Sequence, residues 1–188
     1  MRQNQHTIVS FDDEPLILVD DNDTVLGHAS KVACHQGQGQ LHRAFSVFLF
    51  NRHNELLLQQ RSVHKPLWPL FWSNSCCSHP RRGEGNLQSA QRRLWEELAI
   101  SAKPDFLYRF TYHATFGDIG AEHELCSVYI ARCDTPVTFN QREIAQCSYI
   151  APEVLDQELA DNPHRYTPWL KLEWPCIRQT FWNQLAAL

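Results

Sequence analysis

The sequence contains no continuous apolar stretch of about 18 residues, the shortest length from which a membrane-spanning helix is predicted. Its first residues, MRQNQHTIVSFDDE, lack the apolar segment that a secretory signal peptide requires. Internal repeats, low-complexity tracts and Gly/Ser-rich linkers are missing too. We therefore expect a soluble, cytoplasmic protein with one domain over residues 1–188, comprising a core from about 31 to 170 and a helical C-terminal segment from about 152 to 188.

A large excess of charge of one sign is also lacking. The formal net charge is −4 with the ten histidines taken as neutral, and 43% of the residues are hydrophobic. Nucleic acids and anionic membranes attract proteins through strongly basic surfaces. We therefore expect no nucleic-acid partner and no membrane partner. A monomer is expected, because no segment resembles an obligate interface; a small-molecule substrate is implied only by the family resemblance given below.

The seven cysteines include no CxxC pair, which argues against a zinc ribbon and against a thioredoxin-like site. In a cytosolic protein such cysteines are reduced, and most of them are buried as small hydrophobic residues. Two are adjacent in the segment SNSCCSHP, where His79 follows Cys77 by two residues. A metal site, a nucleophile, a disulfide and simple packing all remain compatible with this pattern.

The hydrophobic pattern indicates strands on both sides of one central helix. Residues 86–98 carry Leu87, Ala90, Leu94 and Leu98 at helical spacing, with Asn86 as the expected N-cap. The segment 65–73, with two prolines and two tryptophans, is expected to be an ordered loop, and short helices are expected on either side of HRYTPWL in the tail. Strands are predicted at 15–20, 44–50, 56–61, 106–114 and 125–132. This order is typical of a mixed α/β layered domain.

Histidines and carboxylates at four places are candidate metal ligands, the fourth being the helix carboxylates Glu96 and Glu97 considered below. His35 and His42 lie seven residues apart around a glycine-containing loop, which would let two imidazoles approach one point. Glu122 and Glu124 precede an apolar stretch, and in an extended chain both carboxylates lie on one face, where they repel unless a cation lies between them. With His79 they would suit magnesium, manganese or zinc. Surface histidines and an exposed acidic turn are the alternatives.

Charged and aromatic residues form two further groups. Glu96 and Glu97 follow Arg92 and Arg93 on the helix, where i, i+4 pairing on a solvated face would explain them. Three basic residues are either a set suited to phosphate oxygens or scattered surface charges: Lys31, Arg61 and Lys65. The aromatic residues of the same region either fill the core or line a pocket, and they comprise Trp68, Phe71, Trp72, Tyr112 and Trp169.

Taken together, these segments resemble the metal-dependent, flavin-free (type 1) isopentenyl-diphosphate isomerases of the Nudix superfamily. The resemblance runs from about Lys31 to Trp169, through KVACHQGQGQLHRAFSVFLFN, LLLQQRSVHKPLWPLFWSNSCCSHP, RRLWEELAI, AEHELCSVY and TPW. It implies a Nudix-type mixed sheet sandwiched between helices, in a single α/β (α+β) domain. It also implies interconversion of isopentenyl and dimethylallyl diphosphate through a tertiary carbocation, which would supply isoprenoid biosynthesis.

The resemblance assigns roles to individual positions. It implies Cys77 and Glu124 as the acid/base pair, with Tyr112 beside the acid, and Trp169 over the hydrocarbon. It implies no flavin, one divalent ion (Mn, Mg or Zn) held by three histidines and two glutamates, and Mg on the substrate diphosphate with help from Glu97. The five ligands are His35, His42, His79, Glu122 and Glu124. The diphosphate-binding positions are Lys31, Arg61, Lys65 and Arg93.

The sequence departs from the general Nudix signature at three positions. Ser78 and Ala99 replace glycines, which would cost stability wherever a positive φ is needed, whereas Glu84 and Arg92 are kept. Arg93 replaces a glutamate that Nudix hydrolases use to gather metal ions, which disfavours diphosphate hydrolysis. A Nudix hydrolase and a non-enzymatic metal- or thiol-binding module remain the competing hypotheses. We expect Cys76, which has no counterpart role, to be a buried small residue.

Overall fold

The structure, a computed structural model, describes residues 6–185, so the ends of the predicted domain at 1–5 and 186–188 lie outside the described residues. A mixed sheet of nine strands is built around β3 (His42–Phe50). This strand runs parallel to β8 (Gly120–Arg132) and antiparallel to β1 (Pro15–Val19), β4 (Leu56–Arg61) and β6 (Cys76–Ser78). The remaining strands pair further out: β2 (Val25–Ser30), β5 (Trp72–Ser73), β7 (Asp105–Phe116) and β9 (Ile144–Ile150).

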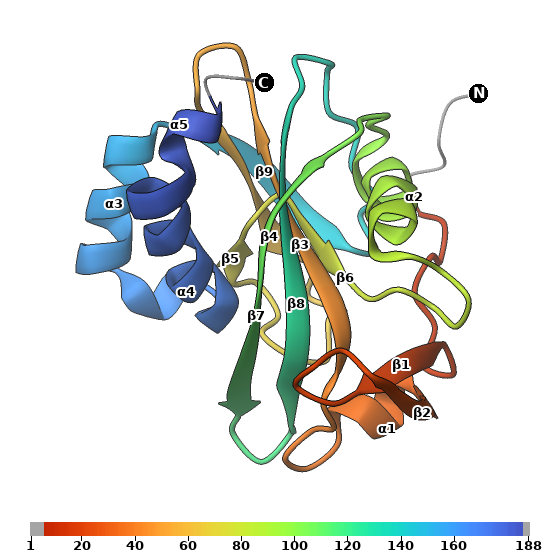
Figure 1. The fold of residues 1–188 in the computed structure, drawn as a ribbon. Coiled ribbons are helices and arrows are strands. Elements are labelled where there is room, and N and C mark those ends of the chain that lie inside the picture. Colours follow the sequence, from red (N-terminus) through yellow and green to blue (C-terminus); the bar gives the residue numbers. More distant parts are fainter. Residues whose placement is uncertain (1–5, 186–188) are drawn as a thin grey trace.

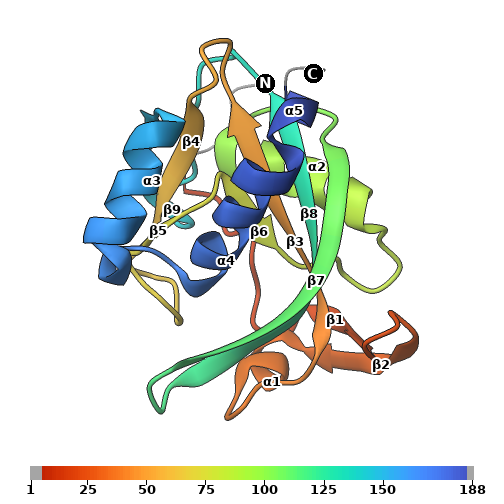
Figure 2. The same cartoon turned by 60° about the vertical axis from the view of Figure 1, so that its left-hand side comes forward.

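Helices cover both faces of this sheet, as Figures 1 and 2 show. The long helix α2 (Asn86–Leu98) lies on one face. The opposite face is covered by the C-terminal helices α3 (Pro152–Asp161), α4 (Pro168–Cys176) and α5 (Trp182–Leu185), with short helices η1 (Pro163–Arg165) and η2 (Ile177–Phe181) between them. The short helix α1 (Lys31–His35) and the β1–β2 hairpin lie together at one end of the sheet (Figure 1). The predicted sheet sandwiched between helices is confirmed.

The apolar run of β3 is explained by burial on both faces. Phe45, Val47 and Leu49 belong to the core beneath α2, whereas Phe48 and Phe50 belong to the core beneath the C-terminal helices. Successive side chains of a strand point to opposite faces, so a strand between two helical layers is apolar throughout. Because its start at His42 lies at the end of the sheet near α1, β3 connects this core with the cluster described below.

Helix α2 agrees with its predicted bounds but differs at both caps. Gly85 is the N-cap residue, so the expectation for Asn86 is wrong; Asn86 is the first helical residue and donates from Nδ2 to Ser127 Oγ at 2.7 Å. Ala99 is the C-cap residue with φ of 56°, in the left-handed region that favours glycine. Ser78 lies in β6 and has no positive φ. The predicted cost of losing a signature glycine therefore applies to Ala99 only.

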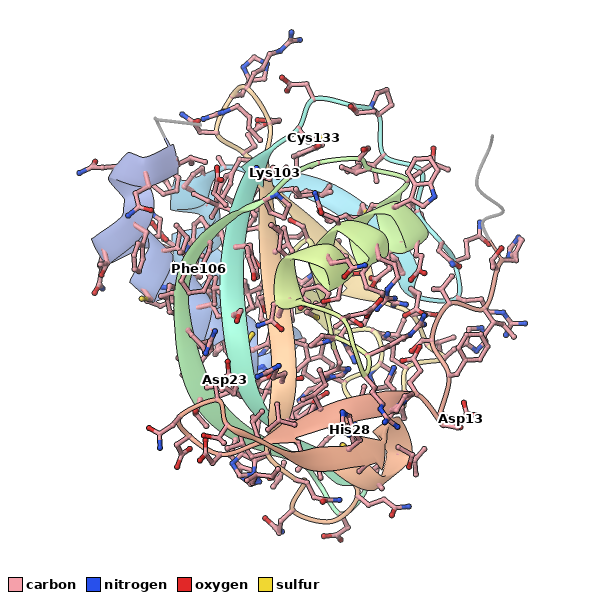
Figure 3. All side chains as sticks on the ribbon, turned by 45° about the vertical axis from the view of Figure 1, so that its right-hand side comes forward. Asp13, Asp23, His28, Lys103, Phe106 and Cys133 are labelled. Atoms are coloured by element: carbon pink, nitrogen blue, oxygen red, sulfur yellow. The ribbon has the colours of Figure 1, made fainter. Side chains whose placement is uncertain are left out.

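In addition to the pairing of β1 with β3, one carboxylate ties the β1–β2 hairpin to the rest of the sheet. Asp23, in the turn of the hairpin (Figure 3), accepts from Arg43 Nε at 2.5 Å on β3 and from Arg109 Nη1 at 2.6 Å on β7. These contacts fix the hairpin against two strands and so fix the position of α1, which follows β2 directly. Among the described residues, no helix is long and apolar enough to cross a membrane.

Candidate active site

Five side chains from four parts of the chain converge at the end of the sheet near α1. Their nitrogen and oxygen ligand atoms all lie within 4.8 Å of one another, and the centroids of the three imidazole rings are 4.8–5.1 Å apart. The register of the sheet explains the convergence, since His42 and Glu124 are direct partners in the parallel β3–β8 pair. The group comprises the predicted ligands His35, His42, His79, Glu122 and Glu124.

Backbone carbonyls orient two of the histidines. His35 Nδ1 lies 2.6 Å from the Lys31 carbonyl oxygen and His42 Nδ1 lies 2.7 Å from that of Gln40, so each ring directs Nε2 into the group. His42 Nε2 is buried and has no hydrogen-bond partner. Burial lowers the pKa of His42 to about 4 and that of His79 well below its usual value, which leaves both rings neutral. Neutral imidazoles with the second nitrogen fixed by a carbonyl are the form that binds metal ions.

Gly120 brings α1 onto β8. A Cβ added at Gly120 would lie 2.4 Å from the His35 carbonyl oxygen, so only glycine permits this approach. The approach sets His35 Nε2 at 2.8 Å from Glu122 Oε2. His35 ends the short helix α1, and the loop with its two glycines begins after it, between the two histidines as expected.

The two glutamates of β8 have different surroundings. Burial raises the pKa of Glu124 well above its usual range, and the neighbouring carboxylate of Glu122 adds to this shift. Burial would also raise the pKa of Glu122, but His35 outweighs it and lowers that pKa. Tyr112 Oη donates to Glu124 Oε2 at 2.7 Å, and His79 Nε2 lies 2.9 Å from Glu124 Oε1. Glu124 is therefore the carboxyl of the pair that retains a proton most readily.

A cavity of about 280 Å³ opens beside this cluster. Cys77 lines it, while Cys76 is fully buried in the core beneath α2, so the expectation that Cys76 is a buried small residue is confirmed. Burial raises the pKa of Cys77 to about 12, with Arg61 acting in the opposite direction. The thiol is therefore neutral at rest. All seven cysteines are free.

Trp169 forms an aromatic wall of the cavity. Its Nε1 donates to Ser73 Oγ at 2.9 Å and to Asn74 Oδ1 at 3.1 Å, which fixes the orientation of the indole. The ring meets Trp68 edge-on with centroids 5.5 Å apart, and Tyr112 lies at 6.3 Å. The tail segment predicted as a loop ends before this residue, because α4 begins at Pro168.

Three of the four predicted diphosphate-binding residues line the cavity: Lys31, Arg61 and Lys65. The Arg61 guanidinium donates to the Leu67 and Trp68 carbonyl oxygens at 2.7 and 3.0 Å, and its Cζ lies 5.1 Å from the Trp169 ring centroid. Burial and the cations of Lys65 and Arg93 lower the pKa of Lys31 to about 8. The cavity therefore has cationic and aromatic walls.

Arg93 and Glu97 are not among the residues that line the cavity. Both are 2% exposed, and Arg93 Nη2 lies 2.7 Å from Glu97 Oε1. Arg93 Nη1 also donates to the Val9 carbonyl oxygen at 2.7 Å. Two residues of the Nudix signature pair separately, since Arg92 contacts both oxygens of Glu84 at 2.7 Å. In this structure the four side chains thus form two ion pairs, and Arg93 also contacts the N-terminal segment.

Sequence reasoning missed several residues around the cavity. Asp12, Gln36 and Ile119 line it, and the amide of Asn74 holds the backbone of β3 and β6 through Val47 and Cys76. The adjacent polar residues in SNSCC were the available signal for Asn74. The segment at 140–143, NQRE, carries a further buried carboxylate at Glu143, 4% exposed, and has no periodicity that distinguishes it from an ordinary polar turn.

Comparisons with known proteins agree with this geometry. Residues 40–170 match the family described as the NUDIX domain. The chain is 42% identical to Isopentenyl-diphosphate Delta-isomerase 1 of Photorhabdus laumondii subsp. laumondii, over 92% of this chain and 99% of that protein. It is 44% identical to Isopentenyl-diphosphate Delta-isomerase of Serratia proteamaculans, over 84% and 87%.

Solved structures show the fold independently of close sequence similarity. The crystal structure of DR0079 from Deinococcus radiodurans has a TM-score of 0.70 at 23% identity, covering 86% of this chain and 98% of that one. MutT protein from Methanosarcina mazei Go1 has a TM-score of 0.62 at 16% identity, over 74% and 94%. The chain therefore belongs to the Nudix family and, within it, groups with the isopentenyl-diphosphate Delta-isomerases.

Proposed function

We propose that this protein interconverts isopentenyl diphosphate and dimethylallyl diphosphate, the activity for which its relatives are named. The observation that carries the proposal is one cavity lined by a thiol, a carboxyl with its phenol partner, an indole and three cationic side chains. These residues are Cys77, Glu124, Tyr112, Trp169, Lys31, Arg61 and Lys65. An acid, a base, a dry apolar wall and an anion-binding end are what a double-bond shift in a diphosphate ester requires.

The acid and the base come from strands on opposite sides of β3. Cys77 on β6 is in register with Ser46, and Glu124 on β8 is in register with His42. The strands β6 and β8 lie two inter-strand spacings apart, about 10 Å, and the two positions are also offset by four residues along β3. The side chains of Cys77 and Glu124 can therefore approach a five-carbon chain from two sides, as the reaction needs.

In the forward direction Glu124, with Tyr112, delivers a proton to the terminal alkene carbon, and the π electrons form the new C–H bond. A tertiary cation results at C3. Cys77, once its thiol has lost its proton to solvent, removes a proton from C2 as the thiolate, and the C–H electrons form the new double bond. Burial raises the pKa of the Cys77 thiol to about 12, so the thiolate is a strong base once formed. The roles exchange in the reverse direction.

Trp169 protects and stabilises this cation. Its hydrogen bonds to Ser73 and Asn74 hold the indole in place before substrate binds. A cation over a desolvated indole face gains about 2 kcal/mol or more. Because the buried rings also exclude water, capture of the cation as an alcohol is suppressed.

The three imidazoles and two carboxylates fit a divalent ion. The unpartnered His42 Nε2 and the neutral rings of His42 and His79 support this assignment. We propose a His₃Glu₂ site for Mn, Mg or Zn formed by the five clustered residues, and no flavin. When bound, such an ion supplies positive charge that fixes the ionisation of the carboxyls near it.

Three cationic side chains of the cavity lining would bind the diphosphate oxygens: Lys31, Arg61 and Lys65. We propose that Mg accompanies the diphosphate, with Glu97 as its protein ligand and Arg93 as a further cation. In the structure Arg93 and Glu97 contact each other behind the cavity wall, so both assignments require these side chains to exchange that contact for the ligand.

The domain organisation, oligomeric state, partners and location of the protein are also proposed. One isomerase domain over residues 1–188, with its core at about 31–170 and a helical end from about 152, is consistent with the Nudix match over 40–170. A monomer with no nucleic-acid or membrane partner and a cytoplasmic location stay predictions. Light scattering of the purified protein would test the monomer.

Incubation with isopentenyl diphosphate and magnesium in deuterated water tests the activity. We expect dimethylallyl diphosphate carrying deuterium, detected by NMR, and no product with the Cys77→Ala protein. Release of phosphate or pyrophosphate without isomer would instead support a Nudix hydrolase. Binding of metal without conversion of either kind would support the non-enzymatic hypothesis.

A further inference from the structure

The turn at residues 140–143 connects three separate parts of the chain behind the cationic end of the cavity. Asn140 N donates to the Glu97 carbonyl oxygen at 2.8 Å, and Asn140 Nδ2 donates to that of Thr7 at 2.8 Å. Ser62 N donates to the Glu143 carbonyl oxygen at 2.9 Å. The turn is thus fixed to α2, to the N-terminal segment and to the loop after β4, and the backbone of Glu143 has a defined position.

The Glu143 side chain is a buried anion among cations. It is 4% exposed, and its Oε2 lies 2.5 Å from Lys65 Nζ and 3.3 Å from Arg93 Nη2. Burial would raise the pKa of Glu143, but Lys65 and then Arg93 outweigh it and hold that pKa far below its usual value. Glu143 does not line the cavity, whereas Lys65 does. The carboxylate therefore contacts the Lys65 ammonium from behind the cavity wall.

The two cations beside Glu143 differ in what else they contact. Arg93 also binds Glu97 and the Val9 carbonyl oxygen, so its position is fixed by several partners. Lys65 has one ion pair among the described residues, the one with Glu143. Lysine carries a flexible four-carbon chain and a charge without fixed geometry. Lys65 also faces repulsion from Lys31, whose pKa it lowers. Without Glu143, both chain entropy and repulsion would favour movement of this ammonium away from the cavity.

We propose that Glu143 is a positioning residue for the diphosphate: it holds the Lys65 ammonium at the cavity wall before substrate binds. This inference rests on the proposed function, in which Lys65 contacts the diphosphate. An ammonium has three N–H donors, so one directed at Glu143 leaves two for phosphate oxygens. In the proposed function Lys65 contacts the diphosphate and not the reacting carbons, and so the contribution of Glu143 is to binding.

A double-mutant cycle with inorganic pyrophosphate and magnesium as the probe tests this without catalysis. Calorimetry would compare wild type, Glu143→Gln, Lys65→Met and the double variant. We expect Glu143→Gln to weaken pyrophosphate binding about tenfold, and to have an effect within about twofold when Lys65 is already methionine. If the fold-losses of affinity in the two single variants multiply in the double variant, Glu143 does not act through Lys65. Wild-type protein that fails to bind pyrophosphate would also overturn the proposal.

Glu96→Gln is the matched control. Glu96 Oε2 lies 3.3 Å from Arg93 Nη1, so this variant removes a carboxylate partner of Arg93 and leaves Lys65 untouched. We expect binding within about twofold of wild type. A loss of affinity equal to that of Glu143→Gln would show that the carboxylates act through Arg93 and not through Lys65, which contradicts the proposal. Glu143→Asp keeps the charge and should restore part of the affinity, including if Glu143→Gln fails to fold.

Steady-state kinetics with isopentenyl diphosphate separate this inference from the proposed function. Glu143→Gln should raise KM with kcat within about threefold of wild type, because the interaction is with a part of the substrate that does not react. An equal loss in kcat with KM unchanged would contradict the positioning role. Absence of isomerisation by the wild type would remove the proposed activity, while the pyrophosphate cycle would still report on the Glu143–Lys65 pair.

Discussion

The hydroxyl of Tyr112 donates to Glu124 Oε2 at 2.7 Å, and the two residues are direct partners across the β7–β8 ladder. Burial and then the Glu124 and Glu122 carboxylates raise the pKa of Tyr112 well above its usual value, so the phenol keeps its proton. Tyr112 is thus a permanent donor to Oε2 of Glu124, and the other carboxyl oxygen, Oε1, faces His79. The carboxyl that we propose as the acid is thus held at both oxygens.

Tyr112→Phe removes this donor and keeps the ring. We expect kcat to fall about 10–100-fold with KM within about threefold, because proton transfer through Glu124 is impaired while diphosphate binding is not. The control is Tyr108→Phe on the same strand, whose hydroxyl donates to the Glu173 backbone oxygen at 3.4 Å, outside the cavity lining. Equal losses in both variants would mean that the hydroxyl of Tyr112 acts through packing alone.

The adjacent cysteines should respond differently to the same substitution. Cys77→Ala should lower isomerisation about 10²–10⁴-fold with the fold and metal content retained, since the thiol lines the cavity and its removal takes away the proposed base. Cys76→Ala should keep most activity and lose about 1 kcal/mol of unfolding free energy, since this side chain is fully buried beneath α2. Kinetics and urea unfolding measure the two effects. Full activity in Cys77→Ala would refute its role.

Gly120→Ala should separate α1 from β8. The new Cβ would lie 2.4 Å from the His35 carbonyl oxygen, so the backbone must shift and His35 must move from Glu122. We expect less bound metal by elemental analysis and a loss of about 1–3 kcal/mol of unfolding free energy. Gly85→Ala is the control for metal content, because a Cβ there meets nothing within 4 Å. Unchanged metal content in Gly120→Ala would show that His35 is dispensable as a ligand.

The fold could be predicted from the sequence where burial leaves a pattern. The continuous apolar run of β3 and the spacing of Ala90, Leu94 and Leu98 on α2 both reflect side chains buried in one core. The strand β2, by contrast, was missed because it lies at the sheet edge, contains a glycine and leaves Val25 and Leu26 exposed. Its pairing with β1 forms backbone hydrogen bonds, which require no pattern of apolar side chains.

The membership of the candidate metal-binding cluster followed from the resemblance, whereas its geometry did not follow from spacing. Its five residues come from α1, β3, the segment after β6, and β8, and they meet because β3 and β8 are parallel neighbours. A long-range pairing of that kind leaves no local sequence signal. Glu143 was missed for the same reason, since only the fold brings a polar turn to within 2.5 Å of Lys65.

Ala99 offers a test of the altered Nudix signature. It caps α2 with φ of 56°, where L side chains are strained and glycine is not. Ala99→Gly should raise the unfolding free energy by about 0.5–1 kcal/mol, the relief of strain exceeding the entropy gained by the unfolded chain. The control, Ala160→Gly in the last turn of α3, has no positive φ and should lose up to about 0.5 kcal/mol. A loss in both variants would contradict the strain at Ala99.

The pH dependence of kcat/KM should report Lys31. Burial and the cations of Lys65 and Arg93 lower its pKa to about 8, so the free enzyme loses this charge above that pH. Because kcat/KM follows ionisations of the free enzyme, it should fall above pH 8 as diphosphate binding weakens. In Lys31→Arg this fall should move to higher pH, since arginine stays protonated. An unchanged fall would assign it to another group.

The lowered pKa of Lys31 should also affect stability. Rising pH weakens the expected diphosphate binding, but it should increase the free energy of unfolding. The unfolded chain, where the pKa of Lys31 is near 10.5, binds this proton more tightly than the folded protein does. The unfolding free energy contributed by Lys31 should therefore rise as the pH increases from about 8 to 10.5, and stay constant below that window. Urea unfolding of wild type and Lys31→Met across this pH range measures the difference in unfolding free energy between the two proteins. A difference that does not change with pH would mean that burial does not lower the pKa of Lys31, and would remove the basis for the kinetic prediction as well.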